Sequence, residues 1–325
     1  MIASIKGLLV VPPLPKERGK YFLVNQIKLM VKILQFIFIL NLFFSYNLFA
    51  QEYSQKELNL YKKFNYLKYK TVEIFTLRDK KDMETGSGII VNKNGQLYLV
   101  TCYHLLAGKM AGDTSIYFDG YNCVPNNVKI YFHTGREHRS FIVEYSLLDK
   151  YGNRKFYVIP KDKKQKWITD ISPRMVSDIV FMPLDYDIIP YFANIKIDTV
   201  SLVDKKSVVT ILPNSLLSVW GFRHGINKYN YPICDTLLTL PDSIINTKGD
   251  YVYALTGKDL RGDSGAPVYI HLKRNKVQFT GIVAEELSPQ YFNKFIEWKN
   301  KKYKNLITYI ISKSFIKYAL NTYVN

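Results

Sequence analysis

The chain has 325 residues, of which 47% are hydrophobic and 15% aromatic, so it can bury the core of one or two domains. Its net charge of +18 raises the question of an anionic partner, but the lysines are dispersed and accompany no helix-turn-helix, zinc-finger or aromatic-basic RNA-binding signature, so we expect a solvated surface and no nucleic-acid partner. Three cysteines, an odd number without a Cys-x-x-Cys spacing, exclude a disulfide-stapled domain.

The first 50 residues differ from the rest of the chain. A basic, proline-containing stretch runs to residue 29, and a short charged region at Met30 then precedes an apolar run that ends at Ala50. This is the build of a secretory signal peptide, so we expect cleavage after Ala50 and a secreted or periplasmic protein without a stable membrane span. A membrane anchor is the alternative, since the run is nearly long enough to cross a bilayer. We also hypothesise that translation starts at Met30.

Residues 51–70 are polar and tyrosine-rich, and the spacing of their apolar residues indicates a short helix. From residue 71 the chain consists of short apolar runs divided by turn residues, which is typical of an all-β sandwich or barrel. The first half predicts strands at 71–77, 86–91, 97–101, 114–118, 128–132, 141–145 and 156–159. The second half predicts strands at 208–211, 216–222, 236–240, 251–255, 268–271 and 277–284, and a helix at 312–321.

A histidine follows a predicted hairpin. The dipeptide Asn94-Gly95 is a strong two-residue turn signal, and His104 comes three residues after Thr101, at the end of the returning strand. Cys102 lies beside apolar neighbours and is expected to pack as a small hydrophobic side chain. The remaining histidines stand in no motif and are interpreted as structural or surface residues: His133, His138, His224 and His271.

An aspartate stands at the head of an apolar run. Asp178 directly precedes Ile179-Val180-Phe181, which predicts a buried strand. Asp170 is a rival candidate, and Asp185 and Asp187 are weaker ones; Asp178 is favoured because it alone directly precedes the Ile-Val-Phe run.

A serine lies between two glycines at residues 262–265, Gly-Asp-Ser-Gly, and an apolar strand follows. Glycine on both sides lets the backbone adopt conformations closed to other residues and lets a substrate come close. Such a loop can present the Ser264 hydroxyl outward while backbone N–H groups point at one spot, as an oxyanion hole requires. Glycine-flanked serines are common in turns, so the histidine and aspartate upstream give this motif its weight.

Together these motifs resemble the trypsin-like (chymotrypsin-fold) serine peptidases. The matching pieces are the Gly-Ser-Gly strand, the Thr-x-x-His turn, the Asp-Ile-Val strand and the Gly-Asp-Ser-Gly-x-Pro loop, in the family's order of His, Asp and Ser. The resemblance covers residues 71–325. The stretch between His104 and Asp178 is long for the family and suggests an insertion, which we place in the charged loop at 161–167.

The resemblance implies an all-β fold of two six-stranded antiparallel β-barrels of the chymotrypsin type, with the active site in the cleft between them and a helix at the C-terminus. The first barrel would span 71–190 and carry His104 and Asp178. The second would span 191–325 and carry Ser264.

The resemblance also implies a role for each residue. Ser264 would attack a peptide carbonyl, His104 would take its proton and return it to the leaving amine, and Asp178 would orient the imidazole. The backbone N–H groups of Gly262 and Ser264 would bind the developing oxyanion. No cofactor and no metal are expected, because the sequence has no His-Glu-x-x-His and no clustered His/Cys ligand set.

The substrate pocket, by the same resemblance, would be lined by Lys258, Asp259, Ala284, Glu285 and Glu286. The adjacent opposite charges at 258 and 259 leave the sign of the pocket open, because a one-residue slip exchanges them. Burying either charge unpaired beneath an aromatic ring would be costly. We therefore expect a charged or small residue before the cut bond.

These observations predict a secreted serine endopeptidase that acts on proteins or peptides. The alternative is a catalytically silent relative that binds without cutting: Ala266 stands where a second glycine is common, and acidic residues follow Ala284 where small or apolar ones are usual. A binder that depends on charge alone is a third possibility.

No zymogen-type cleavage junction precedes residue 71, so activity without cleavage between residues 53 and 71 is expected, with Asp263 bonded to a donor other than a new N-terminal amine. Whether Cys123 and Cys234 meet is left open.

Overall fold

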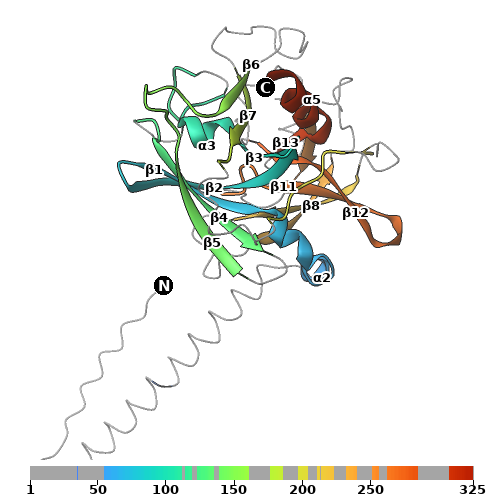
Figure 1. Ribbon diagram of the computed structural model, residues 1–325. Helices are drawn as coiled ribbons and strands as arrows, with labels where there is room; N and C mark the ends of the chain where they lie inside the picture. Colours follow the sequence, from blue (N-terminus) through green and yellow to red (C-terminus); the bar gives the residue numbers. More distant parts are fainter. Residues whose placement is uncertain are drawn as a thin grey trace, which may run out of the picture. The chain divides into compact units, whose positions relative to one another are not determined.

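The computed structural model divides the chain into two compact units, Met1–Leu58 and Asn59–Asn325, and the second contains both β-sheets (Figure 1). The described residues are 35, 55–111, 114–118, 123–134, 139–160, 176–185, 197–203, 211–212, 214–222, 232–239, 251–255, 262–284 and 307–324. The signal peptide, its cleavage position at Ala50, the start at Met30 and the insertion at 161–167 therefore lie outside the described residues. Among those described, no helix has the length and hydropathy to cross a bilayer.

The first sheet has seven antiparallel strands in the order β5-β4-β1-β2-β3-β7-β6. Their bounds are β1 (Val72–Arg78), β2 (Lys81–Lys93), β3 (Gln96–Thr101), β4 (Asn127–Thr134), β5 (Arg139–Ser146), β6 (Tyr157–Pro160) and β7 (Val176–Pro183). Strand β2 is long enough to serve two partners: it pairs with β1 up to Gly88 and with β3 from Ile89 onward.

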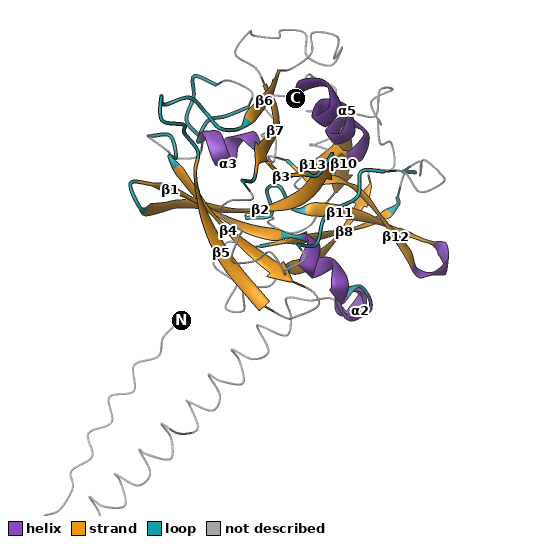
Figure 2. Cartoon of the chain, in the orientation of Figure 1, coloured by secondary structure: helices purple, strands orange, loops and turns teal. Residues whose placement is uncertain are grey.

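The second sheet has six antiparallel strands in the order β10-β13-β12-β11-β8-β9, and the pairs Ala254–Thr239 and Leu255–Leu238 join β10 to β9 at the two ends of this order. The bounds are β8 (Leu216–Gly221), β9 (Ile233–Thr239), β10 (Tyr251–Leu255), β11 (Pro267–Leu272), β12 (Lys276–Val283) and β13 (Ile307–Ser312). Figure 2 shows how strands dominate this unit.

The prediction of two six-stranded antiparallel β-barrels is wrong for the first half. Its sheet has seven strands, and its outer strands β5 and β6 do not pair with each other within the described residues. The physical reason is the length of β2. It pairs with β1 along residues 81–88 and with β3 along residues 89–93, so its two neighbours are offset along the strand and do not lie side by side. An antiparallel all-β fold of two sheets followed by a C-terminal helix is confirmed.

Local signals in the sequence explain most of the elements. At the β2–β3 hairpin, Asn94 and Gly95 both have positive φ, 52° and 90°, as a type I′ turn requires. The helix predicted near the N-terminus is present as α2 (Gln55–Lys63), followed by the 3₁₀ helix η1 (Asn65–Lys70). The C-terminal helix α5 (Lys313–Tyr323) begins where the Ser312 hydroxyl accepts a hydrogen bond from the Phe315 N–H at 3.1 Å.

Two elements differ from the prediction. The strand expected at 114–118 is absent: a single bridge joins Lys109 to Tyr117, and Ile116 is 45% exposed, so the run has no buried face to pack. Strand β13 is not among the predicted strands, although it pairs with both β10 and β12 in the second sheet. The strand expected at 208–211 lies almost wholly outside the described residues.

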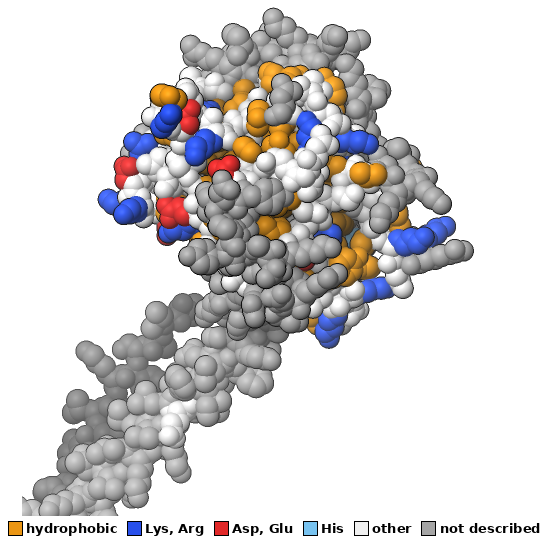
Figure 3. Space-filling view, in the orientation of Figure 1, with side chains coloured by type: hydrophobic (Ala, Val, Ile, Leu, Met, Phe, Trp, Pro, Cys, Tyr) orange, Lys and Arg blue, Asp and Glu red, His pale blue; other side chains and the backbone are white. Residues whose placement is uncertain are grey.

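Three buried clusters form the core, one within each sheet and one shared by both. The shared cluster contains Val100 and Phe181 of the first sheet, Trp220 and Ile282 of the second, and Phe315 of α5, which packs on β12 and β13 (Figure 1). The surface around this core carries lysine and arginine side chains that are scattered across the visible face and not gathered in one patch (Figure 3).

Candidate active site

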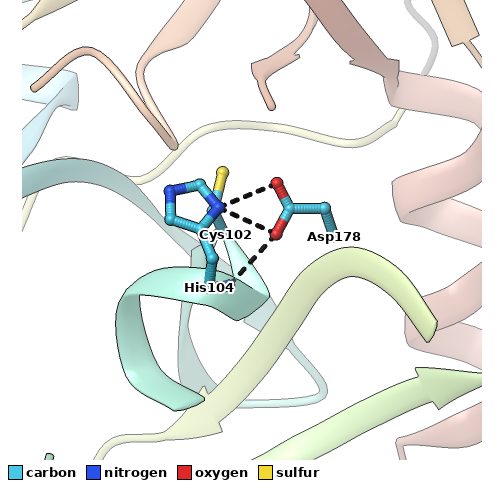
Figure 4. A group of neighbouring side chains, drawn as sticks. All are labelled: Cys102, His104 and Asp178. Atoms are coloured by element: carbon cyan, nitrogen blue, oxygen red, sulfur yellow. Dashed lines mark hydrogen bonds and ion pairs between the residues drawn. The ribbon is translucent and has the colours of Figure 1, made fainter. Parts of the chain in front are cut away.

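His104 and Asp178 form a buried pair. The imidazole Nδ1 lies 3.0 Å from each carboxylate oxygen of Asp178, and the backbone N–H of His104 donates to Oδ1 at 3.1 Å (Figure 4). Their exposed fractions are 0% and 8%. A carboxylate at Nδ1 holds the proton on that nitrogen, so Nε2 is left as the acceptor a general base needs.

The fold explains why these two residues meet. Strand β3 pairs with β7 through Thr101 and Val180, and because the strands are antiparallel, Asp178 comes level with the residues that follow Thr101. The short helix α3 (Tyr103–Ala107) begins there and carries His104. Gly108, with φ +61°, ends the helix by donating its N–H to the His104 carbonyl at 2.9 Å, which fixes the turn under the imidazole.

An aromatic ring covers one side of the imidazole. Phe118 stacks on His104 with ring centroids 4.2 Å apart and an interplanar angle of 25°. The ring excludes water from that side, and in such a medium the attraction between a protonated imidazole and the carboxylate is stronger than in bulk water. No pattern in the sequence predicts this contact, because Phe118 lies in a loop and not in the strand expected at 114–118.

The loop that carries Ser264 is pressed against the first sheet. Gly262 and Gly265 have φ values of 90° and 84°. A Cβ at Gly265 would lie 2.0 Å from the Ser87 carbonyl oxygen and 2.5 Å from Thr101 Oγ1, so only glycine fits. Ser264 itself is partly exposed.

The backbone N–H groups of this loop fall into two kinds. Gly265 donates to the Val283 carbonyl at 2.8 Å, and Ala266 donates to the Asp263 carbonyl at 2.7 Å. In the described part of the chain, the N–H groups of Gly262 and Ser264 make no hydrogen bond. These are the two donors expected to bind an oxyanion, so they are available to a substrate oxygen.

Shared neighbours connect the histidine turn to the serine loop. The Thr101 hydroxyl donates to the Ser87 carbonyl at 2.7 Å, and the Ser87 N–H donates to the Ser264 carbonyl at 2.8 Å. The Cys102 thiol donates to the Val283 carbonyl at 3.1 Å. The Ser264 hydroxyl makes no hydrogen bond within the described residues, so the contact between nucleophile and base is not made here. Such contacts often tighten only when substrate binds.

The aspartate before the serine is buried. Asp263 is 1% exposed, and its carboxylate lies against β8, where a Cβ at Gly221 would come within 2.1 Å of Oδ1. Gly221 is therefore required for the close approach of this carboxylate.

Of the residues predicted for the substrate pocket, only Ala284 is described: it is buried directly after β12. Lys258, Asp259, Glu285 and Glu286 lie outside the described residues, as do the rival aspartates Asp170 and Asp187. Asp185 lies near Tyr145, whose pKa is raised by burial and, less, by this carboxylate.

Two other histidines have structural surroundings, as predicted. His133 Nδ1 lies 2.8 Å from the Ser140 hydroxyl, and burial, followed by the charge of Lys68, lowers the His133 pKa to about 4. His271 Nε2 lies 2.8 Å from the Ser218 hydroxyl. His138 and His224 lie outside the described residues.

The cysteines form no disulfide with one another, so Cys123 and Cys234 do not pair. Cys102, buried as predicted, offers a sulfur within 4.8 Å of the ligand atoms of His104 and Asp178 (Figure 4). These three could in principle hold a metal ion. In this structure each of the three donors has a partner within the protein: the imidazole and the carboxylate are at hydrogen-bond distance from each other, and the thiol donates to a backbone carbonyl.

No family model and no curated protein match this chain. Among solved structures it is similar to Deg5 (14% identity, 72% of this chain and 88% of that chain, TM-score 0.41). It is similar to the Rv3671c protease of M. tuberculosis in its active form, with 14% identity over 81% of this chain and 84% of that chain and a TM-score of 0.42. It is also similar to a scabies mite inactivated protease paralogue, S-I1, with 13% identity over 78% of this chain and 94% of that chain and a TM-score of 0.42.

Proposed function

We propose that this protein is a trypsin-like serine endopeptidase, with His104, Asp178 and Ser264 as its catalytic residues. The observation that carries the proposal is the buried His104–Asp178 pair, in which the carboxylate contacts both the ring Nδ1 and the backbone N–H of the histidine. This double contact fixes the ring orientation and the tautomer at once, which is what a general base for serine requires.

The reaction would proceed in two stages. Ser264 Oγ attacks the carbonyl carbon while His104 Nε2 takes the hydroxyl proton, and the carbonyl oxygen becomes an oxyanion that the N–H groups of Gly262 and Ser264 bind. His104 then protonates the leaving amine, and the acyl-enzyme remains. Water, deprotonated by the same Nε2, releases the acid and restores the serine.

The partly exposed serine supports a protein or peptide substrate. Polypeptide can reach the hydroxyl from solvent, whereas the pair that activates it stays buried. We further propose a small or charged residue before the cut bond, and secretion after cleavage behind Ala50. Profiling a random peptide library tests the first, and N-terminal sequencing of secreted protein, expected to begin at Gln51, tests the second.

A fluorophosphonate probe tests the central proposal. The serine oxygen bonds to phosphorus and fluoride leaves, so labelling requires an activated serine. We expect wild-type protein to label, Ser264→Ala to remain unlabelled, and Ser146→Ala, which removes an exposed hydroxyl elsewhere on the first sheet, to label like wild type. Labelling of Ser264→Ala at the wild-type rate would overturn the assignment of the nucleophile. A folded wild type that neither labels nor hydrolyses a protein substrate would favour the silent relative.

A further inference from the structure

Ser87 of β2 is a buried polar residue that connects three parts of the structure: the serine loop, the end of β3 and the end of β8. It is 0% exposed. Its N–H donates to the Ser264 carbonyl at 2.8 Å, and its carbonyl accepts from the Thr101 hydroxyl at 2.7 Å. Its own hydroxyl donates to the Gly262 carbonyl at 3.1 Å and accepts from the Phe222 N–H, at the end of β8, at 2.9 Å. Its N–H, its carbonyl and its hydroxyl, both as donor and as acceptor, therefore each have a partner.

The bonds to the Gly262 and Ser264 carbonyls hold the backbone on either side of the peptide group between residues 263 and 264. The carbonyl of Gly262 belongs to the peptide that precedes Asp263, and the carbonyl of Ser264 belongs to the peptide that precedes Gly265. Between them lies the peptide that carries the Ser264 N–H. Because peptide groups are planar, fixing both flanking planes restricts the direction of this N–H. The Ser264 N–H is one of the two loop donors that make no hydrogen bond in the described chain.

The same residue also joins the two sheets at this point. Ser87 and Thr101 belong to the first sheet, whereas Phe222 follows β8 of the second, and the serine loop precedes β11. The nucleophile loop is thus covalently part of the second sheet but hydrogen-bonded to the first, which carries His104. A side chain that can both donate and accept is needed here, and a hydroxyl on a short stem does so without filling the space that the loop occupies.

We infer that Ser87 is a positioning residue for the oxyanion-binding loop, and that through the Gly262 and Ser264 carbonyls it sets the direction of the Ser264 N–H, one of the two donors proposed to stabilise the transition state. The inference rests on the proposed peptidase function for its effect on rate. Its effect on the loop backbone does not depend on that function.

Replacing Ser87 with alanine tests the inference. The change leaves the Gly262 carbonyl and the Phe222 N–H buried without their partner, and the loop should loosen. We expect the maximal labelling rate with the fluorophosphonate to fall by about tenfold to a hundredfold, while the half-saturating probe concentration stays within about twofold, because the oxyanion donors act in the transition state. We also expect faster hydrogen exchange at the Gly265 and Ala266 amides, by about tenfold or more.

Thr239→Val is the matched control. Thr239 is 1% exposed, and its hydroxyl likewise donates to one backbone carbonyl (Leu212) and accepts from one backbone N–H (Ser215), both at 2.7 Å. Neither partner belongs to the candidate site. This variant should lose a similar amount of stability while its labelling rate and its exchange in the serine loop stay at wild-type values.

The outcomes separate the two proposals. If Ser87→Ala loses stability as Thr239→Val does but keeps wild-type labelling and loop exchange, Ser87 is merely structural and the inference fails. If wild type does not label at all, the proposed function fails, and the exchange comparison still decides whether Ser87 holds the loop. If Ser87→Ala does not fold, Thr101→Val, which frees the Ser87 carbonyl, decides by the same measurements: about a threefold slower labelling with faster loop exchange supports the inference, and wild-type values overturn it.

Discussion

The carboxylate of Asp178 distinguishes a triad from three residues that share a neighbourhood. Asp178→Asn keeps the size of the side chain but lets its amide donate to Nδ1, which stabilises the tautomer with the proton on Nε2. We expect the labelling or hydrolysis rate to fall by about ten-thousandfold with little change in substrate affinity. Asp185→Asn is the control and should retain activity. A loss of less than about tenfold in Asp178→Asn, measured on folded protein, would contradict the assigned role.

A second carboxyl group makes stability depend on pH. Glu73 of β1 is buried, its Oε2 has no hydrogen-bond partner within the described residues, and burial raises its pKa from 4.5 to about 7. Ser87 of β2 and Tyr131 of β4 lie opposite it, and Lys129 and His133 are the charged or titratable residues next along β4 on the same face. The folded state therefore binds a proton between pH 4.5 and 7 that the unfolded state releases.

The sign of this effect can be measured by difference. The stabilisation from the protonated Glu73 is complete below pH 4.5 and is lost as the pH rises to 7. Glu73→Gln stays neutral, so its free energy of unfolding should exceed that of wild type by a margin that grows from near zero below pH 4.5 to about 3 kcal/mol at pH 8. Urea unfolding at several pH values measures it, with exposed Glu144→Gln as control. A margin that does not change with pH would contradict the burial of an uncharged carboxyl.

Buried His133 has the opposite effect on stability. Its pKa is lowered to about 4. Below pH 6.5 the unfolded state therefore binds a proton that the folded state does not bind, and the free energy of unfolding falls as the pH drops from 6.5 to 4. In wild-type protein the pH dependence that His133 adds to the free energy of unfolding partly cancels that of Glu73. Subtracting wild type from Glu73→Gln removes the His133 contribution, because His133 is present in both proteins.

At the scale of elements, the serine loop depends on the close approach of two segments. Gly265→Ala meets both a positive φ and the carbonyl oxygen of Ser87 at 2.0 Å, whereas Gly152→Ala meets the same φ of 84° with nothing within 4 Å. We expect Gly152→Ala to cost about 1 kcal/mol of unfolding free energy. Gly265→Ala should cost at least twice that and abolish labelling of Ser264. Equal costs, measured by urea unfolding, would show that the loop does not press on β2 as the structure has it.

The elements that sequence predicted well are those with local causes. The dipeptide Asn94-Gly95 predicts the turn between β2 and β3, the apolar run after Asp178 predicts β7, and the serine between two glycines predicts the loop of Ser264. Other features have no local cause. The contacts of Ser87 with Gly262 and Phe222 and the stacking of Phe118 on His104 join residues that are distant in the sequence or lie in loops. The burial of Glu73 likewise depends on the strands on either side of it, and its residue type does not signal it. The seven-stranded order of the first sheet was missed for the same reason, since strand pairing across a sheet leaves no local pattern.

At the scale of the whole unit, the site exists only where the two sheets meet. Asp178 lies in β7 of the first sheet, His104 lies in α3 directly after β3, and Ser264 lies in the loop before β11, so any displacement of one sheet against the other separates base from nucleophile. The shared cluster around Trp220 resists this displacement: the indole is fully buried and stacks on Tyr61 with ring centroids 5.5 Å apart. Stability and activity should therefore respond together to changes in this cluster.

Trp220→Ala tests this coupling. Removing the indole leaves a cavity between the sheets and should lower the free energy of unfolding by about 3–5 kcal/mol. Because the cluster is common to both sheets, unfolding followed by circular dichroism and loss of Ser264 labelling should occur at the same urea concentration in wild type, and both should shift down together in the variant. Leu212→Ala, at a residue 62% exposed, should shift neither. If labelling of Trp220→Ala is lost well before its secondary structure, the sheets separate as independent bodies, and the shared cluster serves to align the site without making the fold cooperative.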